Sequence, residues 1–392
     1  MSALNPFERL ALLAIALLSA LAGVANYGGW APVPRFLIAT LALAGLAWVV
    51  SFATEQLGDR FGPGVTGLLQ STLGNLPELF VVIFALQKGE VVVAQTAIVG
   101  SILANALLVL GLVIVVGARR SHDGIMRFSK KLPRDTATLL QVTVFIIVLL
   151  GLSLSSHDPA SHHVKVISIV GAICLLVVYA TWVVPYLRSD PGPEQAGGAP
   201  SERAAPREQA PADAGGSTRA DSPGSGSRGS GSTVPAAHAR GMPLWLVLCM
   251  LLTGGAASAF VSDWFVNALQ PSIELLHISQ AFAGLVIVAI AGNAVENAAG
   301  LVLASKGRFD LAISVVKNSV AQIAAFLFPA LVLISLALST TLTFSLAPVY
   351  IGALVLTVLA LAQITGDGEA AAFEGWALIA LYVILATLTA YE

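Results

Sequence analysis

The sequence predicts an all-α integral membrane protein with eleven transmembrane helices: one extra N-terminal helix, followed by two inverted repeats of five helices each. Three observations lead to this prediction. Hydrophobic residues make up 56% of the chain and charged residues only 11%, whereas a soluble domain is about 25% charged. Long apolar runs recur along the whole chain. Two segments in different halves share the same polar residues.

Composition also excludes several classes of function. The formal net charge of −2 gives no indication of nucleic-acid binding. The two cysteines, Cys174 and Cys249, lie alone in apolar runs, so neither a disulfide framework nor a zinc ligand set is visible. The sequence contains no hydrolase or metalloprotease motif. We expect no enzymatic activity and no cofactor; the expected partners are the lipid bilayer and transported ions, and the oligomeric state is not indicated.

The apolar runs are long enough to count spans, because a membrane-crossing helix needs roughly 20 mostly apolar residues. Eleven runs qualify: 10–26, 36–54, 64–86, 91–117, 136–155, 164–187, 243–262, 279–304, 309–337, 343–364 and 371–390. The run at 64–86 is the weakest, because polar residues that include Asn75 and Glu78 interrupt it. No cleavage site typical of a signal peptide follows the first run, so we interpret it as a retained span.

A segment rich in Gly, Pro, Ser and Ala, residues 188–242, predicts a flexible linker. It divides the chain into an N-terminal extra helix (1–34), a first repeat (35–187), the linker itself and a second repeat (243–392). Lys and Arg concentrate in the N-terminus, the linker and the loops on the same side. The positive-inside rule therefore predicts a cytoplasmic N-terminus and an outer C-terminus. We expect the protein in a cell membrane.

An internal repeat supports the division into halves. GNLPELFVVIFALQKGEVVVAQTAIVGS (74–101) aligns without gaps with GNAVENAAGLVLASKGRFDLAISVVKNS (292–319). Identical pairs are Gly74/Gly292, Asn75/Asn293, Glu78/Glu296, Lys88/Lys306, Gly89/Gly307, Ala94/Ala312 and Ser101/Ser319. An odd number of predicted crossings separates the two segments, so the repeats are inverted, an architecture typical of secondary transporters.

Glu78 and Glu296 are the two acidic residues placed deep within predicted spans. A charged group there costs at least ~2.5–3.5 kcal/mol, so an ion or proton pathway is the first hypothesis. Asn75 and Asn293 precede the glutamates by three residues, which places each amide on the same helix face as its carboxylate. Gly74 and Gly292 allow close backbone approach. Carboxylates, amides and backbone carbonyls form an all-oxygen site that suits Ca²⁺, and also Na⁺ or Mn²⁺.

Charge balance predicts how such a site works. Two carboxylates neutralise one Ca²⁺, and without the metal two close anions repel each other. Protons then replace the metal on the same carboxylates. The residues therefore favour a secondary antiporter that exchanges a cation for H⁺ by alternating access between the two sides of the membrane.

The two motifs carry a family resemblance. GNLPEL followed by GSILANALLVLG, and GNAVEN followed by NSVAQIAAFL, resemble the signature regions of the cation/proton exchanger family within the cation/Ca²⁺ exchanger superfamily. The resemblance covers spans two to eleven and implies exchange of Ca²⁺ for H⁺. It also implies that polar residues on the following span of each repeat help the glutamates to bind the cation; here these are Ser101, Asn105, Ser319 and Gln322.

Two residues depart from the family pattern. Asn297 stands where many members have histidine, so the proton route or the cation preference is expected to differ. Lys317 has no charged counterpart in the first repeat. We expect it to snorkel or to face the cytoplasmic vestibule; if it reached the glutamates instead, it would favour a monovalent substrate. Na⁺/H⁺, K⁺/H⁺ and Mn²⁺ exchange stay open, and a cation channel is the remote alternative.

Overall fold

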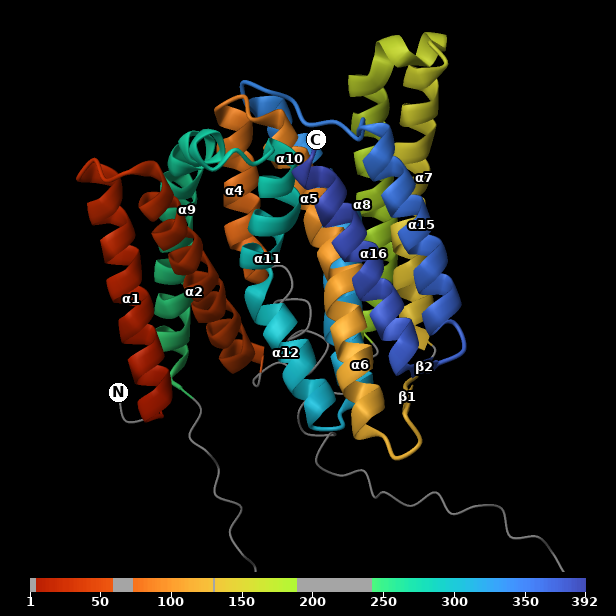
Figure 1. The fold of residues 1–392 in the computed structure, drawn as a ribbon, viewed down its shortest axis with the longest axis horizontal. Helices are drawn as coiled ribbons and strands as arrows, with labels where there is room; N and C mark the ends of the chain where they lie inside the picture. Colours follow the sequence, from red (N-terminus) through yellow and green to blue (C-terminus); the bar gives the residue numbers. More distant parts are fainter. Residues whose placement is uncertain (1–4, 59–72, 130, 189–241) are drawn as a thin grey trace, which may run out of the picture.

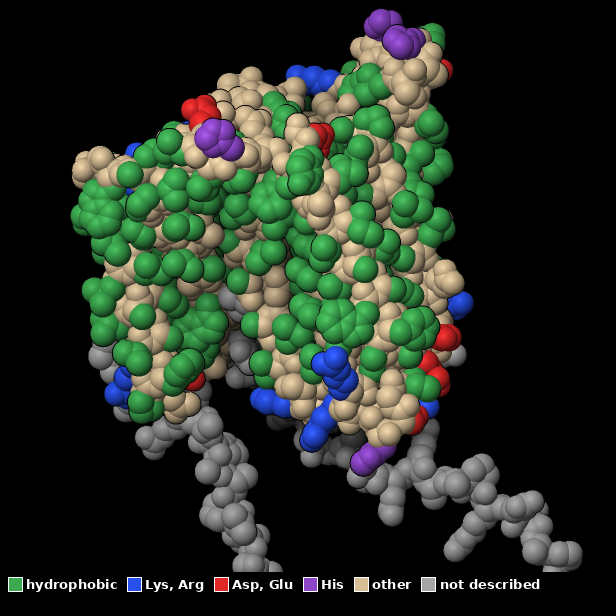
Figure 2. All heavy atoms as spheres, in the orientation of Figure 1, with side chains coloured by type: hydrophobic (Ala, Val, Ile, Leu, Met, Phe, Trp, Pro, Cys, Tyr) green, Lys and Arg blue, Asp and Glu red, His purple; other side chains and the backbone are tan. Residues whose placement is uncertain are grey.

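The computed structural model describes residues 5–58, 73–129, 131–188 and 242–392. Within these residues the chain forms a bundle of helices (Figure 1). Nine helices of the described part are long and apolar enough to cross a membrane, and a bent pair, Gln280–Gly292 and Glu296–Ser305, makes a tenth. Hydrophobic side chains cover the middle of the face in Figure 2, and charged groups gather near its upper and lower edges. The protein is therefore a multi-pass transmembrane protein.

The described elements of the first half alternate long helices with short irregular turns. In order they are α1 (Pro6–Tyr27), α2 (Pro32–Gly58), α4 (Leu76–Gln87), α5 (Val91–Leu103), the π-helical η1 (Ala104–Val109), α6 (Leu110–Arg120), β1 (Ile125–Arg127), α7 (Lys131–Ser155), the 3₁₀ turn η2 (Pro159–His163) and α8 (Val164–Arg188). α1 shows why these helices begin where they do. The Asn5 N–H donates to Glu8 at 2.7 Å in a capping box, and Pro6 occupies the first helical position.

The second half contains the longest helix and two further π-helical turns. In order its elements are α9 (Leu244–Leu276), α10 (Gln280–Phe282), the π-helical η3 (Ala283–Val288), α11 (Ala289–Gly292), α12 (Ala294–Ser305), α13 (Phe309–Gln322), the π-helical η4 (Ile323–Leu327), α14 (Phe328–Ile334), the 3₁₀ turn η5 (Ser335–Ala337), α15 (Pro348–Thr365), β2 (Glu369–Ala371) and α16 (Ala372–Ala390). The four segments from α10 to α12 together form the bent span.

The predicted number of eleven spans depends on one segment that is only partly described. Residues 64–72 of the predicted span 64–86 lie outside the described residues, and α4 is the part of it that is seen. The predicted linker, 188–242, also lies outside the described residues except at its two ends. The eleven-helix count and the division into two five-helix repeats therefore stay predictions, whereas the helical, multi-span character of the chain is established.

A small sheet corrects the prediction of a purely helical fold. β1 and β2 pair antiparallel, with Arg127 opposite Glu369. The Phe128 N–H extends the pairing by donating to the Gly368 carbonyl at 2.8 Å. The sheet forms because the loop after α6 and the loop between α15 and α16 meet at one end of the bundle and satisfy each other's backbone groups. It joins the two halves of the chain outside the helices.

α9 is much longer than the predicted span. The prediction ended at residue 262, whereas α9 continues without interruption to Leu276 and contains Pro271. Polar residues from Asp263 onward lower the hydropathy, which ends an apolar run but does not end a helix. At about 1.5 Å per residue, the 33 residues of α9 extend for about 50 Å, more than the roughly 30 Å hydrocarbon core of a bilayer.

The two matching segments adopt the same local structure. α4 and α12 each contain 12 residues and begin directly after an asparagine. Each is capped at its end by a lysine, Lys88 or Lys306, after which a glycine takes a positive φ of 79° at Gly89 and 76° at Gly307. A 13- or 14-residue helix and a π-helical turn then follow in each half. Figure 1 places α4 in the upper half of the bundle and α12 in the lower half.

The helices fall into a peripheral group and a central group. α2 packs along α9, and α1 packs against both; the three helices stand together on the left of Figure 1. α4, α5, α12 and α13 occupy the centre, where η3 lies against α5 and α13 contacts η1. Close packing of α5 on η3 needs Gly100, because a Cβ there would lie 2.4 Å from the Leu285 carbonyl oxygen. The central group holds both predicted glutamates.

Candidate cation site

Glu78 and Glu296 occupy the same position in equivalent helices. Glu78 is the third residue of α4, and Glu296 is the third residue of α12. Each helix begins directly after an interruption of the helical geometry, at Asn75 in the first half and at Asn293 in the second. The two parts of the second broken span, Gln280–Gly292 and Glu296–Ser305, meet at 59°. Both glutamates are buried, with exposed fractions of 1% for Glu78 and 8% for Glu296. Broken spans of this kind place backbone and side-chain oxygens inside a transporter without exposing them to lipid.

The two glutamates approach each other from opposite halves of the chain, and their carboxylates are close enough for the charges to interact. The predicted glycines lie beside the glutamates of the opposite segments. A Cβ at Gly292 would lie 3.7 Å from the Glu78 Cβ, and a Cβ at Gly74 would lie 3.4 Å from the Glu296 Oε1. Each glycine is therefore a direct neighbour of the glutamate of the other segment.

Asn293 joins the two halves by hydrogen bonds on the Glu78 side of the site. Its Nδ2 donates to Ser101 Oγ at 3.0 Å, to the Ala289 carbonyl at 2.9 Å and to Glu78 Oε1 at 3.5 Å. The Ser101 hydroxyl also donates to Glu78 Oε1. In addition, Asn293 Oδ1 accepts from Asn105 Nδ2 at 3.1 Å. The asparagine amide therefore holds side chains from α4, α5 and η1 in one network.

The network continues to the second glutamate. Asn105 Nδ2 donates to Ser319 Oγ at 3.0 Å, and the Ser319 hydroxyl is hydrogen-bonded to Glu296. Ser101 and Ser319 therefore contact the glutamate of their own repeat, and Asn105 joins the two sides. The side chains of Asn105 and Ser319 are both buried.

Several buried oxygens of the site have no hydrogen-bond donor among the described residues. They include Oε2 of Glu78, Oε2 of Glu296 and Oε1 of Gln322. A buried carboxylate oxygen without a donor is costly, and either a cation or a proton removes that cost. Asn75, the remaining predicted residue, is buried at the break before α4. Gln322 lies beside Tyr179 of α8 at the edge of the site.

Lys317 does not behave as predicted. Its side chain is only 2% exposed, so it does not snorkel to an aqueous surface. Its Nζ donates to Thr365 Oγ1 of α15 at 2.6 Å, on the side of α13 that faces α15. The burial follows from the packing of α13 between α12 and α7, which one sequence does not reveal. Asn297, the other departure from the family pattern, is partly buried, and its Oδ1 has no partner among the described residues.

Sequence reasoning missed two serines of α9. The Ser262 hydroxyl donates to the carbonyl of Pro77, the residue before Glu78, at 3.3 Å. Ser258, one turn earlier, is fully buried, and its hydroxyl has no partner among the described residues. Their i, i+4 spacing in an apolar run is a signal for a polar face directed at a neighbouring helix, but it does not indicate which helix.

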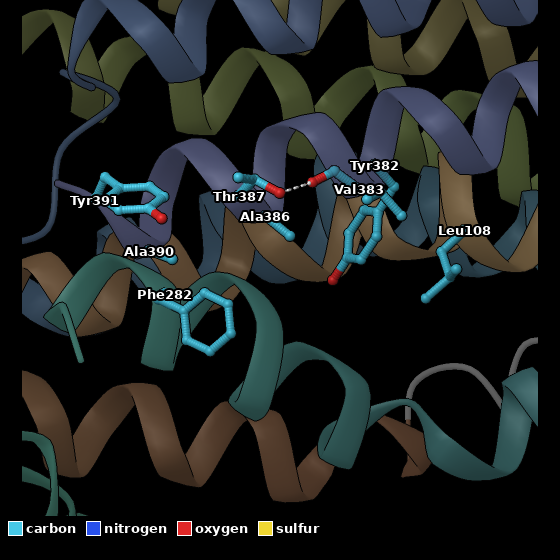
Figure 3. Close-up of a pocket in the computed structure, with 8 residues that line it drawn as sticks. All are labelled: Leu108, Phe282, Tyr382, Val383, Ala386, Thr387, Ala390 and Tyr391. Carbon is cyan, nitrogen blue, oxygen red and sulfur yellow. Dashed lines mark hydrogen bonds between the residues drawn. The ribbon is translucent and has the colours of Figure 1, made fainter. Parts of the chain in front are cut away.

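A cation at this site would depend on more than carboxylates. Among the described residues, no group of three or more His, Cys, Asp or Glu side chains is arranged to hold a metal ion. Amide and hydroxyl oxygens must therefore complete the coordination of Ca²⁺, which takes six to eight oxygens. A separate cavity of about 450 Å³, lined mainly by α16 side chains such as Tyr382 and also by Phe282 of α10, includes neither glutamate (Figure 3).

These observations define a class of protein: a multi-pass membrane protein in which two helices that begin at matching backbone breaks bring two buried carboxylates together. Residues 32–186 and 246–391 match the family described as sodium/calcium exchanger protein. The chain belongs to this family. The resemblance predicted from the two GN-x-x-E motifs is confirmed.

Individual relatives cover nearly the whole chain. It is 28% identical over 357 residues to a Ca(2+)/H(+) antiporter of Aphanothece halophytica, covering 91% of this chain and 90% of that protein. It is 29% identical over 369 residues to a Ca(2+)/H(+) antiporter of Synechocystis, covering 92% of each. Among solved structures, native YfkE matches with a TM-score of 0.74 at 24% identity, covering 97% of this chain and 100% of YfkE. The H+/Ca2+ exchanger CAX matches with a TM-score of 0.70 at 14% identity, covering 98% of this chain and 92% of CAX. These two structural matches establish the fold alone.

Proposed function

We propose that this protein is a secondary antiporter that exchanges Ca²⁺ for H⁺ across a membrane by alternating access. One observation carries the proposal: two buried carboxylates from matching segments lie close enough for their charges to interact, and each keeps one oxygen without a donor among the described residues. The names of the relatives agree with this substrate pair, since several are described as Ca(2+)/H(+) antiporters.

Charge balance supplies the mechanism. One Ca²⁺ neutralises the two carboxylates of Glu78 and Glu296, and its departure leaves two anions that repel each other in a medium of low dielectric constant. Protons relieve that repulsion. The site is therefore occupied either by the divalent cation or by protons, and this exclusion couples the two fluxes. Because the two carboxylates interact, each protonation step of the site belongs to the pair and not to Glu78 or Glu296 individually.

The remaining side chains would act on the cation through neutral oxygens. Ser101 is hydrogen-bonded to Glu78, and Ser319 to Glu296. Either hydroxyl can turn its oxygen toward a cation once the carboxylate binds that cation. Asn293 keeps both halves in register through the network described above. Gln322 Oε1 is a further acceptor that has no donor in the described part of the chain. A site of carboxylate, amide and hydroxyl oxygens favours hard cations over Cu⁺ or Zn²⁺.

Alternating access requires one group of helices to move against another. The central group, with α4, α5, α12 and α13, holds the site, and the peripheral helices are the moving parts in this proposal. Arg119 and Arg120 end α6, and Lys306 and Arg308 flank the turn after α12; Figure 1 shows both helix ends at the lower edge of the bundle. The positive-inside rule assigns this edge to the cytoplasm of a cell membrane.

A monovalent exchanger is the second candidate within the same fold. Na⁺/H⁺ or K⁺/H⁺ exchange would need only one carboxylate to be neutralised, and Mn²⁺/H⁺ exchange would use the same charge balance as Ca²⁺. A cation channel is the remote alternative, because selectivity filters are typically rings of groups in a pore, whereas this site is enclosed between two halves of one chain.

Reconstituted proteoliposomes test the proposal. Uptake of Ca²⁺, Na⁺, K⁺ and Mn²⁺ is measured under an imposed pH gradient for the native protein and for Glu78→Gln and Glu296→Gln. We expect Ca²⁺ to move against the proton gradient and both variants to be inactive. Asp310→Asn, which changes a carboxylate at the start of α13 that accepts from the Ser129 N–H, is the matched control. Undiminished Ca²⁺/H⁺ exchange in either glutamine variant would contradict the mechanism.

A further inference from the structure

α9 is fastened to α4 near both ends of α4. At the beginning, Ser262 donates to the Pro77 carbonyl at 3.3 Å, directly before Glu78. At the end, Lys88 forms an ion pair with Asp263, with 3.4 Å between Nζ and Oδ1. α9 belongs to the peripheral group and α4 to the central group. These contacts therefore cross the boundary along which the proposed motion takes place.

The ion pair is part of a closed set of three side chains. Lys88 Nζ also donates to Asn267 Oδ1, and Asn267 Nδ2 donates to Asp263 Oδ2 at 3.0 Å. Asp263 and Asn267 are four residues apart and lie on one face of α9, so both meet the ammonium from the same side. Glu274 is the other acidic residue of α9, and α9 contains no Lys or Arg. The positively charged partner of Asp263 therefore comes from outside α9, and it is Lys88.

We propose that Lys88, Asp263 and Asn267 form a latch that holds α9 on α4 in this conformation and opens during each exchange cycle. The proposal rests on the proposed function, because it names the contact that alternating access must break. Because the cytoplasmic edge is assigned to the opposite end of the bundle, the latch lies toward the outer side of the membrane. There it holds α9 against α4, which includes Pro77, the residue next to Glu78.

The energetics of this contact suit a reversible latch. The side chains of Lys88 and Asp263 are 32% and 40% exposed, and an exposed ion pair contributes only about 0–1 kcal/mol. Water can solvate both charges when the pair separates, so opening leaves no buried unpaired charge. Removing one partner of a fully buried ion pair costs about 3–5 kcal/mol, because the other charge stays buried and unpaired. A buried pair here would therefore hold α9 on α4 too strongly for rapid cycling.

The second repeat offers a natural comparison. Lys306 occupies the position that matches Lys88, at the opposite end of the bundle. It is exposed and forms no ion pair with the described residues. The two ends of the site are therefore fastened differently in this conformation, and Lys306→Glu is a matched control for Lys88→Glu in the charge-exchange experiment.

Cross-linking tests the latch directly. Lys88→Cys and Asp263→Cys are combined in a chain whose own cysteines are replaced by Cys174→Ser and Cys249→Ser, and the pair is joined with a short thiol-reactive reagent cleavable by reductant. We expect the cross-link to stop exchange and reductant to restore it. Arg127→Cys with Glu369→Cys, another ion-paired position between distant segments, is the control pair, and its cross-link should leave exchange unchanged. Normal exchange by fully cross-linked Lys88→Cys/Asp263→Cys protein would overturn the latch.

The cross-linking yield is a second readout that does not depend on transport. Because cation and protons shift the population of the two states, the yield at the latch pair should differ between Ca²⁺-loaded protein and protein at low pH without Ca²⁺. A yield that is the same under every cation and pH would overturn the latch. A changing yield without any exchange would instead contradict the proposed function and leave the latch supported.

Charge exchange separates a specific contact from general surface charge. Lys88→Glu alone and Asp263→Lys alone should each place like charges together and alter the exchange rate. The double variant restores the opposite pairing and should recover most of the native rate. Additive effects in the double variant would mean that the two side chains do not act as a pair, and would contradict the latch.

Discussion

Gly74 and Glu296 lie against each other although they belong to different halves of the chain. A Cβ added at Gly74 would lie 3.4 Å from Glu296 Oε1, the nearest heavy atom to that position. Gly292 has the corresponding place beside Glu78, but there the nearest atom would be the Glu78 Cβ at 3.7 Å. The two glycines therefore differ: a Cβ at Gly74 would be nearest to a carboxylate oxygen, whereas a Cβ at Gly292 would be nearest to the Cβ of a glutamate.

This difference predicts unequal effects of the same substitution. Gly74→Ala should fold normally, because 3.4 Å is an ordinary contact, but its methyl group takes space that a cation or its water needs beside Glu296 Oε1. We expect a weaker apparent affinity for Ca²⁺, measured as the concentration for half-maximal uptake. Gly292→Ala is the matched variant and should stay close to the native affinity. Equal effects of the two substitutions would show that the glycines serve only backbone packing.

Asn293→Ala should weaken both the fold and the site. The substitution removes donors to Ser101 and to the Ala289 carbonyl and the acceptor of Asn105 Nδ2. Leaving such buried groups unpaired costs about 1–3 kcal/mol of folding free energy. Loss of the amide that positions Ser101 and Glu78 should in addition weaken Ca²⁺ binding. Thermal unfolding in detergent and Ca²⁺ affinity measure the two effects. Asn318→Ala is the control, because Asn318 Oδ1 has no partner among the described residues and its loss should cost less.

Lys317→Met should leave cation selectivity unchanged. The lysine ammonium donates to Thr365 rather than to the site, so it does not act as a built-in cation for the carboxylates. Stability should stay the same or rise, since methionine fills a similar volume without a buried charge. Relative uptake of Na⁺ and Ca²⁺ in proteoliposomes and thermal unfolding test both statements. An increased preference for Ca²⁺ over Na⁺ in the variant would mean that Lys317 reaches the glutamates in another state of the cycle.

The pH dependence of exchange should originate in the site and not in the small sheet. Apparent Ca²⁺ affinity should fall as pH falls, because protons compete for the carboxylates. At the sheet, the Arg127 guanidinium and the Ile125 N–H lower the pKa of Asp123. A depressed pKa stabilises the folded state above the unfolded pKa of about 3.9, and this contribution disappears only as pH falls below that value. Asp123→Asn should therefore leave the pH profile between about pH 5 and 8 unchanged; a displaced profile would place a pH-sensitive group at the sheet.

The sequence predicted the parts of the site that repeat. Because Gly74, Asn75 and Glu78 recur as Gly292, Asn293 and Glu296, a single chain shows two copies of one local structure, and broken helices begin at both. The family resemblance also implied that Ser101 and Ser319, on the following span of each repeat, help the glutamates. The structure brings these side chains into one network, while their function stays a prediction.

Contacts between segments that do not match each other in sequence could not be predicted in the same way. No local pattern indicates that Ser262 meets the Pro77 carbonyl, that Asp263 pairs with Lys88, or that Lys317 donates to Thr365 of α15. Such contacts depend on how helices pack, and packing follows from many small complementary surfaces. The end of α9 was misplaced for a related reason, since hydropathy detects where lipid contact ends and not where a helix ends. The sheet escaped prediction because its strands are only three residues long.

The network that joins the halves also dictates an order of events during synthesis. Glu78 and Ser101 are 23 residues apart and are made together, but Asn293 follows Glu78 by 215 residues and Ser319 follows Asn105 by 214. β1 likewise waits for β2, 242 residues later between Arg127 and Glu369. The first half must therefore enter the membrane with the Glu78 carboxylate bonded only to Ser101, and with an Asn105 amide whose partners in the second half do not yet exist. Completion of the cation site is a late step of folding, reached when the second half has been inserted and docked.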